Sequence, residues 1–169
     1  MKPWILDLNK VFLLIFILCC LPTIIVSSEK DSLVNVYQSD AKNEDKVMAL
    51  LKLSTIQRDI DAYSSIKNAK NAIQIANKIP DKTYLIRSYA KLGITYRNVD
   101  SVDKALETFL KGLELANEME DKEWQTNFLN YLGSSYLHYN QNTIALKYFK
   151  KSYNIAIEKN DSTSPCKLL

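Results

Sequence analysis

The chain has 169 residues, of which 47% are hydrophobic and 24% charged, with a formal net charge of +3, a balance typical of one soluble globular domain. It contains only three glycines, whereas average usage of about 7% predicts roughly twelve, and this shortage disfavours phosphate-binding loops and sheet-rich folds with tight turns. One histidine and three cysteines leave little material for a metal site or a histidine-based catalytic centre. Composition therefore favours a helical protein that is not an enzyme and holds no cofactor.

Residues 1–28 are expected to form a secretory signal peptide or an N-terminal membrane anchor. Residues 11–26 are apolar and uncharged, and lysines precede them. As a helix this stretch would rise about 24 Å, less than the roughly 30 Å of a bilayer core, and small side chains at 26–28 suit a cleavage site. We prefer a cleaved signal, which predicts an exported protein, periplasmic or secreted. The alternative is a membrane tether formed by residues 4–26.

The remaining chain begins with a polar stretch, residues 29–44, that is expected to be a leader ahead of the folded part. After cleavage Cys166 is the one cysteine left in the sequence, so an intrachain disulfide cannot form. The weak positive charge gives no support for nucleic-acid binding.

From about position 45 the sequence repeats with a period of 40 residues, which is its strongest pattern. The repeat divides the chain into units of about 45–80, 81–120 and 121–161, followed by a tail at 162–169. The first unit matches more loosely than the other two. The equivalent positions include Ala76, Ala116 and Ala156; Leu92-Gly93 and Leu132-Gly133; Tyr96 and Tyr136; Ala105 and Ala145; and Phe109 and Phe149.

The sequence pattern of each unit predicts two helices and no strand. Apolar and small residues recur at i, i+3, i+4 and i+7 over residues 89–96, which places them on one helix face. Residues 98–101 interrupt this pattern, and Asp100 is expected to begin the next helix. Asp81 and Asp121 are candidate N-caps of the helices that open the second and third units.

Glycine within a helix costs roughly 1 kcal/mol relative to alanine, so the repeated glycines need a structural reason. We expect Gly93 and Gly133 to let the two helices of a unit approach closely. Phe109 and Phe149, at equivalent places in the second helices, are expected to fill the space around this approach.

This combination of residues resembles the tetratricopeptide repeat (TPR) family, over about residues 45–161. The period of 40 residues exceeds the family's usual 34, so the resemblance is to long-repeat members such as bacterial exported and sensory proteins. It implies an all-α fold, an α-α superhelix (TPR solenoid) of about three helix-turn-helix repeats.

The resemblance also implies a concave groove, lined by the first helix of each unit, that binds a peptide or protein segment without catalysis. Arg58, Arg87 and Arg97 suit bidentate binding of a carboxylate, although each alone is equally well explained as a solvated helix charge. His138 lacks a second ligand nearby in the sequence, so we expect it at the groove rim. Carried over by position, the groove residues are Leu51, Thr55 and Arg58 in the first unit, Arg87, Ala90, Ile94 and Arg97 in the second, and Asn127, Asn130, Ser134 and His138 in the third.

No helix is predicted after Asp161, so apolar residues of the last unit, among them Ile144, Tyr148 and Ile155, are expected to be uncovered. A partner or a second copy would then cover them by association, or the chain is a shortened form of a longer protein.

Two functions therefore remain open. The first is a protein-binding module whose partner is a protein or peptide, with no nucleic acid and with membrane contact only through an uncleaved N-terminal segment. The alternative is a sensory input domain, or its remnant, of a bacterial TPR-containing histidine kinase or transcriptional regulator.

Overall fold

The computed structural model describes residues 28–163, so the predicted signal peptide or anchor and most of the predicted tail lie outside the described residues. Residues 28–38 are helical, where the sequence predicts a polar leader, and Tyr37 packs against the core. In the part of the chain described, no helix is both long enough and apolar enough to cross a membrane. The helices that follow are α2 (Asn43–Gln57), α3 (Ala62–Ala76), α4 (Thr83–Asn98), α5 (Val102–Glu118), α6 (Lys122–His138) and α7 (Asn142–Thr163).

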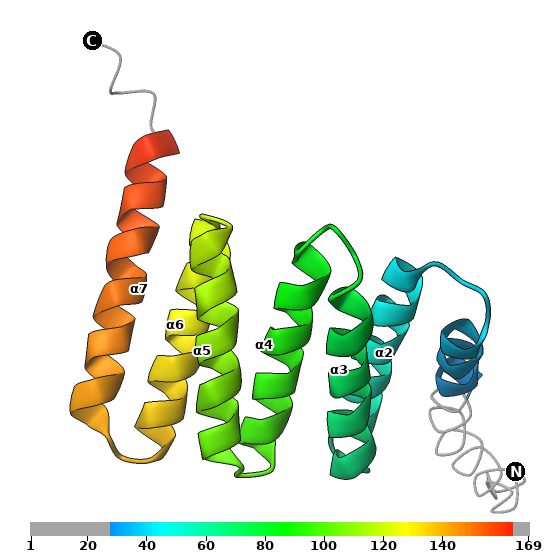
Figure 1. Ribbon diagram of the computed structural model, residues 1–169. Coiled ribbons are helices and arrows are strands. Elements are labelled where there is room, and N and C mark those ends of the chain that lie inside the picture. The colour runs from blue at the N-terminus through cyan, green and yellow to red at the C-terminus, as the bar shows by residue number, and fades with distance from the viewer. Residues whose placement is uncertain (1–27, 164–169) are drawn as a thin grey trace, which may run out of the picture.

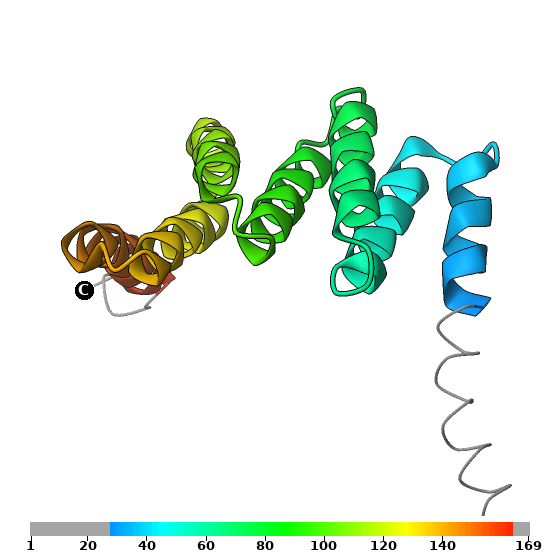
Figure 2. The same ribbon diagram turned by 90° about the horizontal axis from the view of Figure 1, so that it is seen from below.

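These helices form three hairpins that stack in chain order, from right to left in Figure 1. The first helices of the hairpins, α2, α4 and α6, contact one another in sequence, whereas the second helices α3, α5 and α7 make no close backbone contact with one another. The first helices therefore form an inner layer and the second helices an outer layer. Figure 2 shows α5 displaced to one side of α4 and α6. The predicted all-α solenoid is confirmed, and the arrangement fits a TPR-type repeat fold.

Aspartates ahead of α4 and α6 bind free backbone N–H groups at the helix starts. Asp121 is an N-cap as predicted, whereas the N-cap of α4 is Lys82 rather than Asp81. Asp121 is the N-cap of α6 and accepts from the backbone nitrogens of Glu123 and Trp124, both at 3.0 Å. Asp81 lies just ahead of α4 and accepts from the Thr83 nitrogen at 2.8 Å. Hydrogen bonds from the side chain and the backbone N–H of Thr83 hold the pKa of Asp81 below its usual value.

The turns between helices contain residues with left-handed backbone conformation. Asp100, Glu120 and Asn140 have φ of 54°, 52° and 57°. Each next residue donates its N–H to a carbonyl five positions back, as from Ser101 to Tyr96 at 2.9 Å, which is the Schellman arrangement at a helix C-terminus. The prediction that Asp100 begins a helix is wrong, because Asp100 closes α4 and Ser101 is the N-cap of α5. Helix ends that usually use glycine are thus made without it.

The glycines in the helices lie directly against phenylalanine rings, as the repeat pattern predicts for two of them. A Cβ atom added to Gly93 would lie 2.3 Å from the Phe109 ring, and one added to Gly133 would lie 2.7 Å from Phe149. Both distances are well inside van der Waals contact. Each glycine therefore allows the two helices of one hairpin to pack at close range.

Gly112 makes the same contact between hairpins rather than within one. A Cβ atom on Gly112 of α5 would lie 2.2 Å from the Phe128 ring of α6. Phe128 is fully buried, and its ring lies 5.8 Å from Trp124 and 5.9 Å from Tyr131, measured between centroids. The ring of Phe109 on α5 lies 6.4 Å from Phe128 and 5.2 Å from Tyr131, so these aromatic contacts join the second hairpin to the third.

Gly93→Ala is expected to lower the free energy of unfolding by about 1–3 kcal/mol, because the overpacking cost exceeds the helix propensity that alanine gains. Gly133→Ala should cost less, since Phe149 is half-buried and has room to move, whereas Phe109 is fully buried. Urea denaturation followed by circular dichroism measures both, with Asn130→Ala on the exposed surface of α6 as the control. A stabilised Gly93→Ala protein would contradict the packing.

Glu120→Gly is expected to raise the free energy of unfolding by about 1 kcal/mol, because glycine adopts the left-handed conformation without the steric cost of a side chain. Asn140→Gly should gain less, since asparagine tolerates this conformation better than glutamate. The same denaturation experiment compares the two, and equal or negative changes would refute the assignment.

Candidate functional site

The candidate site is the inner face, which we define as the side of α2, α4 and α6 that carries the predicted groove residues. Two of these residues, Leu51 and Ala90, are buried, with 8% and 5% of their surface exposed. They occupy equivalent places on α2 and α4, and the next first helix packs against each of these two helices. The prediction that they contact a ligand is therefore corrected: they belong to the core. Asn130, at the equivalent place on α6, is exposed.

One group of inner-face residues joins α2 to α4. Lys91 donates from Nζ to Thr55 Oγ1, and the two atoms are 2.6 Å apart. Partial burial, together with the positive charge of Arg58, lowers the pKa of Lys91. Arg58 itself binds Asp59 through two nitrogens, at 2.9 and 3.0 Å. Arg58 is therefore paired with the next residue in the chain, whereas the Lys91 side chain is half-buried without an ion pair among the described residues.

A second group joins α4 to α6. Arg97, Asn98 and Asp100 from the end of α4, with Ser134 and His138 from α6, line an open pocket of about 470 Å³. His138 Nε2 lies 3.4 Å from Asp100 Oδ1, and both side chains are mainly exposed. The pocket therefore offers a guanidinium, an imidazole and one carboxylate to a ligand.

Positive charge dominates these two groups. Arg87 lies one turn before Lys91 on α4, and its Nη1 is 3.8 Å from Met48 Sδ of α2. The carboxylates in the groups are Asp59, which pairs with Arg58, and Asp100, which lies beside His138. Outside the groups, the charge of Arg87 also contributes to lowering the pKa of Asp81, after the hydrogen bonds from Thr83. Within the described residues Arg87, Lys91 and Arg97 form no ion pair. Helix α4 thus presents three cations that are available to an acidic ligand.

Of the other predicted groove residues, Ile94, Asn127 and Ser134 are half-buried, and His138 is exposed with Asn130. Lys91, Met48 and Asp100 also belong to this face, and the predicted groove residues did not include them. Asp100 follows α4 and His138 ends α6. The two residues therefore occupy similar places in successive units, 38 residues apart. The period itself was the signal that could have brought them together.

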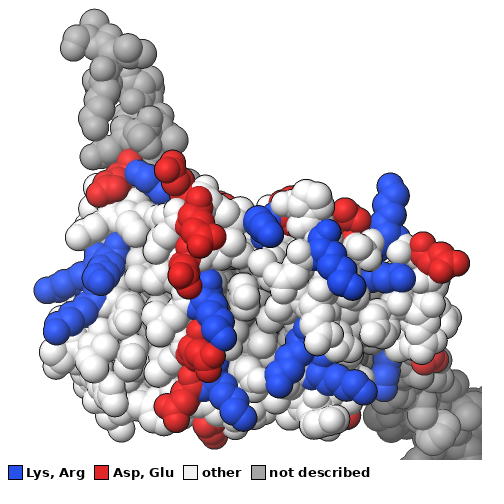
Figure 3. All heavy atoms as spheres, in the orientation of Figure 1, with Lys and Arg blue, Asp and Glu red and all other residues white. Residues whose placement is uncertain are grey.

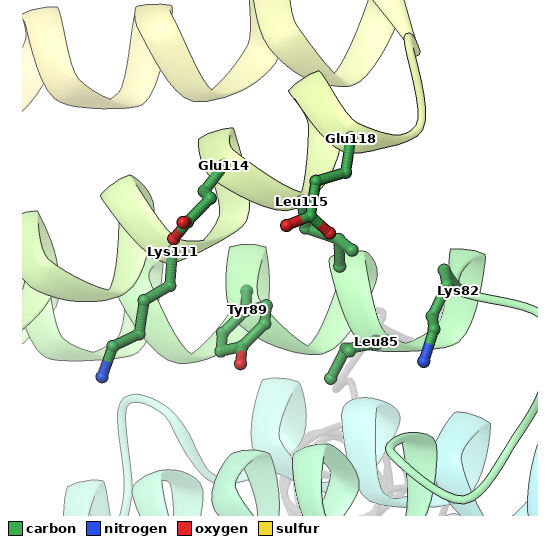
Figure 4. Close-up of a pocket in the computed structure, with 7 residues that line it drawn as sticks. All are labelled: Lys82, Leu85, Tyr89, Lys111, Glu114, Leu115 and Glu118. Carbon is green, nitrogen blue, oxygen red and sulfur yellow. The ribbon is translucent and has the colours of Figure 1, made fainter.

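Another pocket, of about 380 Å³, lies between α4 and α5 (Figure 4), and the sequence did not indicate it. It lies on the side of these helices where α3 and α5 make no close backbone contact with one another. Of its apolar lining, Tyr89 is half-buried, and Leu85 and Leu115 are buried. Its rim carries both signs of charge, and Lys111 pairs with Glu107 at 2.7 Å. Figure 4 shows the lining side chains, which are Lys82, Leu85, Tyr89, Lys111, Glu114, Leu115 and Glu118. We do not assign it a ligand, because its charges balance.

Neither the inner face nor this second pocket provides a recognisable catalytic centre in the described residues. No group of three or more histidine, cysteine, aspartate or glutamate side chains lies together there so as to hold a metal ion. His138 and Asp100 are both exposed to solvent, and Ser134 lines the same pocket. Among the described residues no hydrogen bond joins the Ser134 hydroxyl to His138, whose Nε2 lies near Asp100 instead. The inner face is therefore suited to binding by charge and hydrogen bonds.

Lys91→Met is expected to raise the free energy of unfolding at pH 7, because folding half-buries the Lys91 charge near Arg58. The pKa of Lys91 is lowered by folding, so this cost is fully present below the folded-state pKa. It disappears as the pH rises through that pKa toward the pKa of the unfolded chain. The gain from Lys91→Met should therefore shrink toward pH 10, measured by urea denaturation at several pH values. Lys52→Met, at an exposed lysine of α2, is the control, and an equal gain there would refute this account.

Comparisons with known proteins add little to this description. No family model matches the chain, and no curated protein matches it. Among solved structures, the crystal structure of MamA is similar to this chain at 21% sequence identity, with 78% of this chain and 89% of that chain covered and a TM-score of 0.38. At this level of similarity the fold rests on the helices and contacts of the chain itself.

Proposed function

We propose that the chain is a non-catalytic protein-binding module whose inner face holds an acidic, extended segment of a partner. The observation that carries this proposal is the set of three cations on α4, Arg87, Lys91 and Arg97, which form no ion pair within the described residues. A half-buried lysine beside an arginine costs stability, and sites that bind ligands often keep such a cost.

The geometry is compatible with a segment that crosses the first helices. Neighbouring packed helices have axes about 8–10 Å apart, so three of them span about 20 Å, which roughly six extended residues cover. Carboxylates of such a segment would bind the guanidinium groups of Arg87 and Arg97 in bidentate fashion. The amides of Asn127 and Asn130 offer donors and acceptors to its backbone.

Two features of this module remain proposals from the sequence. The apolar stretch at 11–26 supports an exported or membrane-tethered module, and the 40-residue period supports a long-repeat TPR variant. A sensory input role would use the same inner face, with a signalling partner as its output, so that alternative is tested by the identity of the partner rather than by the groove.

Arg87→Ala combined with Arg97→Ala is expected to weaken binding of acidic peptides by at least about tenfold, because each charge-assisted hydrogen bond contributes about 1.5–3 kcal/mol. The probe is a displayed random-peptide library selected on the immobilised full chain, which we expect to enrich sequences rich in aspartate and glutamate. Affinities of the enriched peptides are then measured by fluorescence anisotropy.

The matched control is Lys67→Ala combined with Lys78→Ala, which removes two exposed charges from the second helix of the first hairpin and the turn after it. This control should leave the affinities unchanged. Enrichment of peptides without acidic residues, or equal losses in the two double variants, would refute the proposed use of the inner face.

A further inference from the structure

The last helix of the array, α7, exposes an apolar stripe. Within the described residues, six of the nine exposed large hydrophobic side chains lie between positions 137 and 157. On α7, Leu146 is 53% exposed, Tyr153 66% and Ile157 41%. Their spacing of seven and then four residues places them on one face of the helix. An apolar stripe of this kind marks a surface for association.

A comparison of α7 with α5, the equivalent helix of the second hairpin, shows what normally covers this surface. On α5 the equivalent stripe is covered by α6: Phe109 is fully buried and its ring lies 5.2 Å from Tyr131 of α6, measured between centroids. On α7 each equivalent position is more exposed than on α5. Helix α7 therefore presents the surface that a first helix covers inside the array. The equivalent pairs are Leu106 and Leu146, Phe109 and Phe149, and Leu113 and Tyr153.

The middle of α6 presents a polar residue, which limits the size of the occupant. Asn130 of α6 is exposed, whereas Ala90, its equivalent on α4, is buried under the next hairpin. A further hairpin in the same register would bury the Asn130 amide, which is costly unless it is hydrogen-bonded. The apolar surface therefore lies mainly on α7, with Leu137 and Tyr139 at the adjoining end of α6, and it matches a single helix.

The charges beside the stripe indicate the chemistry of that helix. Lys147, Lys150 and Lys151 are exposed on α7, whereas the corresponding part of α5 holds the ion pair of Glu107 and Lys111. Figure 3 shows acidic and basic side chains alternating down α5, while the α7 end, at the left, displays basic side chains among uncharged surface. An occupant with acidic side chains would complement this charge.

We propose that α7 docks an amphipathic α-helix of a partner protein, with its apolar stripe on Leu146, Phe149 and Tyr153 and its acidic side chains beside Lys147 and Lys150. This is a helix-in-groove type of recognition, and it does not depend on the inner face. In the first hairpin Lys70, at the place equivalent to Lys150, contacts the next first helix. Its Nζ lies 6.0 Å from the centre of the Tyr96 ring on α4.

A second copy of the chain fits this surface less well. Two α7 helices face to face would bring their lysines together, which is unfavourable. The first helix α2 of another copy is already flanked by the helix over residues 28–38, whose Tyr37 packs against the core. Both the isologous and the head-to-tail arrangement therefore lack a free, complementary surface.

The test uses the full chain in a nonionic detergent and synthetic helical peptides of about 20 residues, long enough to form a helix. One peptide has leucines at i, i+3, i+4 and i+7 with glutamates beside them, and its matched partner has lysines in place of the glutamates. Fluorescence anisotropy should show the acidic peptide binding at least about tenfold more tightly than the basic one. Lys147→Glu combined with Lys150→Glu should reverse this preference.

Leu146→Glu combined with Tyr153→Glu should lower the affinity for the acidic peptide at least about tenfold, and Leu110→Glu, at an exposed leucine of α5, should not. Circular dichroism checks that the variants fold. Equal binding of the two peptides, or no loss in the double variant, would overturn the proposal. So would a dimer of the full chain, or binding to vesicles of anionic phospholipid, that the same double variant abolishes. The N-terminal segment is common to all variants and cancels in these comparisons.

Discussion

The array depends on the close contact between a glycine on one helix and a phenylalanine ring on the next. It occurs within the second hairpin at Gly93, between hairpins at Gly112 and within the third hairpin at Gly133. In each case the ring occupies the volume that a Cβ atom would need, so the distance between the helices is set by the ring thickness. Dense packing of this kind offsets the roughly 1 kcal/mol that glycine costs in a helix. The few glycines of the chain are all in helices, and none lies in a turn.

The first hairpin solves the same packing problem with serine. At the place of Gly93 it has Ser54, and at the place of Ala105 it has Ser65. The two hydroxyls are hydrogen-bonded at 3.0 Å, and Ser65 also donates to the Ser54 carbonyl at 2.7 Å. Ala69 then replaces the phenylalanine, since a ring would not fit beside two buried hydroxyls. This difference explains why the first unit matches the repeat only loosely although its two helices pack in the same way.

The sequence predicted what depends on period and residue size, and missed what depends on how hairpins stack. The helix pairs and the close packing at Gly93 and Gly133 follow from spacing, and the resemblance to the tetratricopeptide repeat family added the solenoid. Asp100 was misassigned because aspartate suits both the start of a helix and a left-handed helix end, and only the neighbouring turns distinguish the two. Leu51 and Ala90 were misassigned because the period does not tell which side of a first helix the next hairpin covers.

The charges of the two proposed binding surfaces lie at positions where the units differ from one another. On α5 the apolar residues of the repeat are packed against the core, whereas on α7 the equivalent residues are more exposed and supply apolar contact but no choice of charge. Among the described residues the three α4 cations and the lysines at 147, 150 and 151 form no ion pair, and their charges are not required by packing. Since the helices would stack without them, their charges are available for recognition. In a solenoid, positions that depart from the period without weakening the core are therefore the first places to look for function.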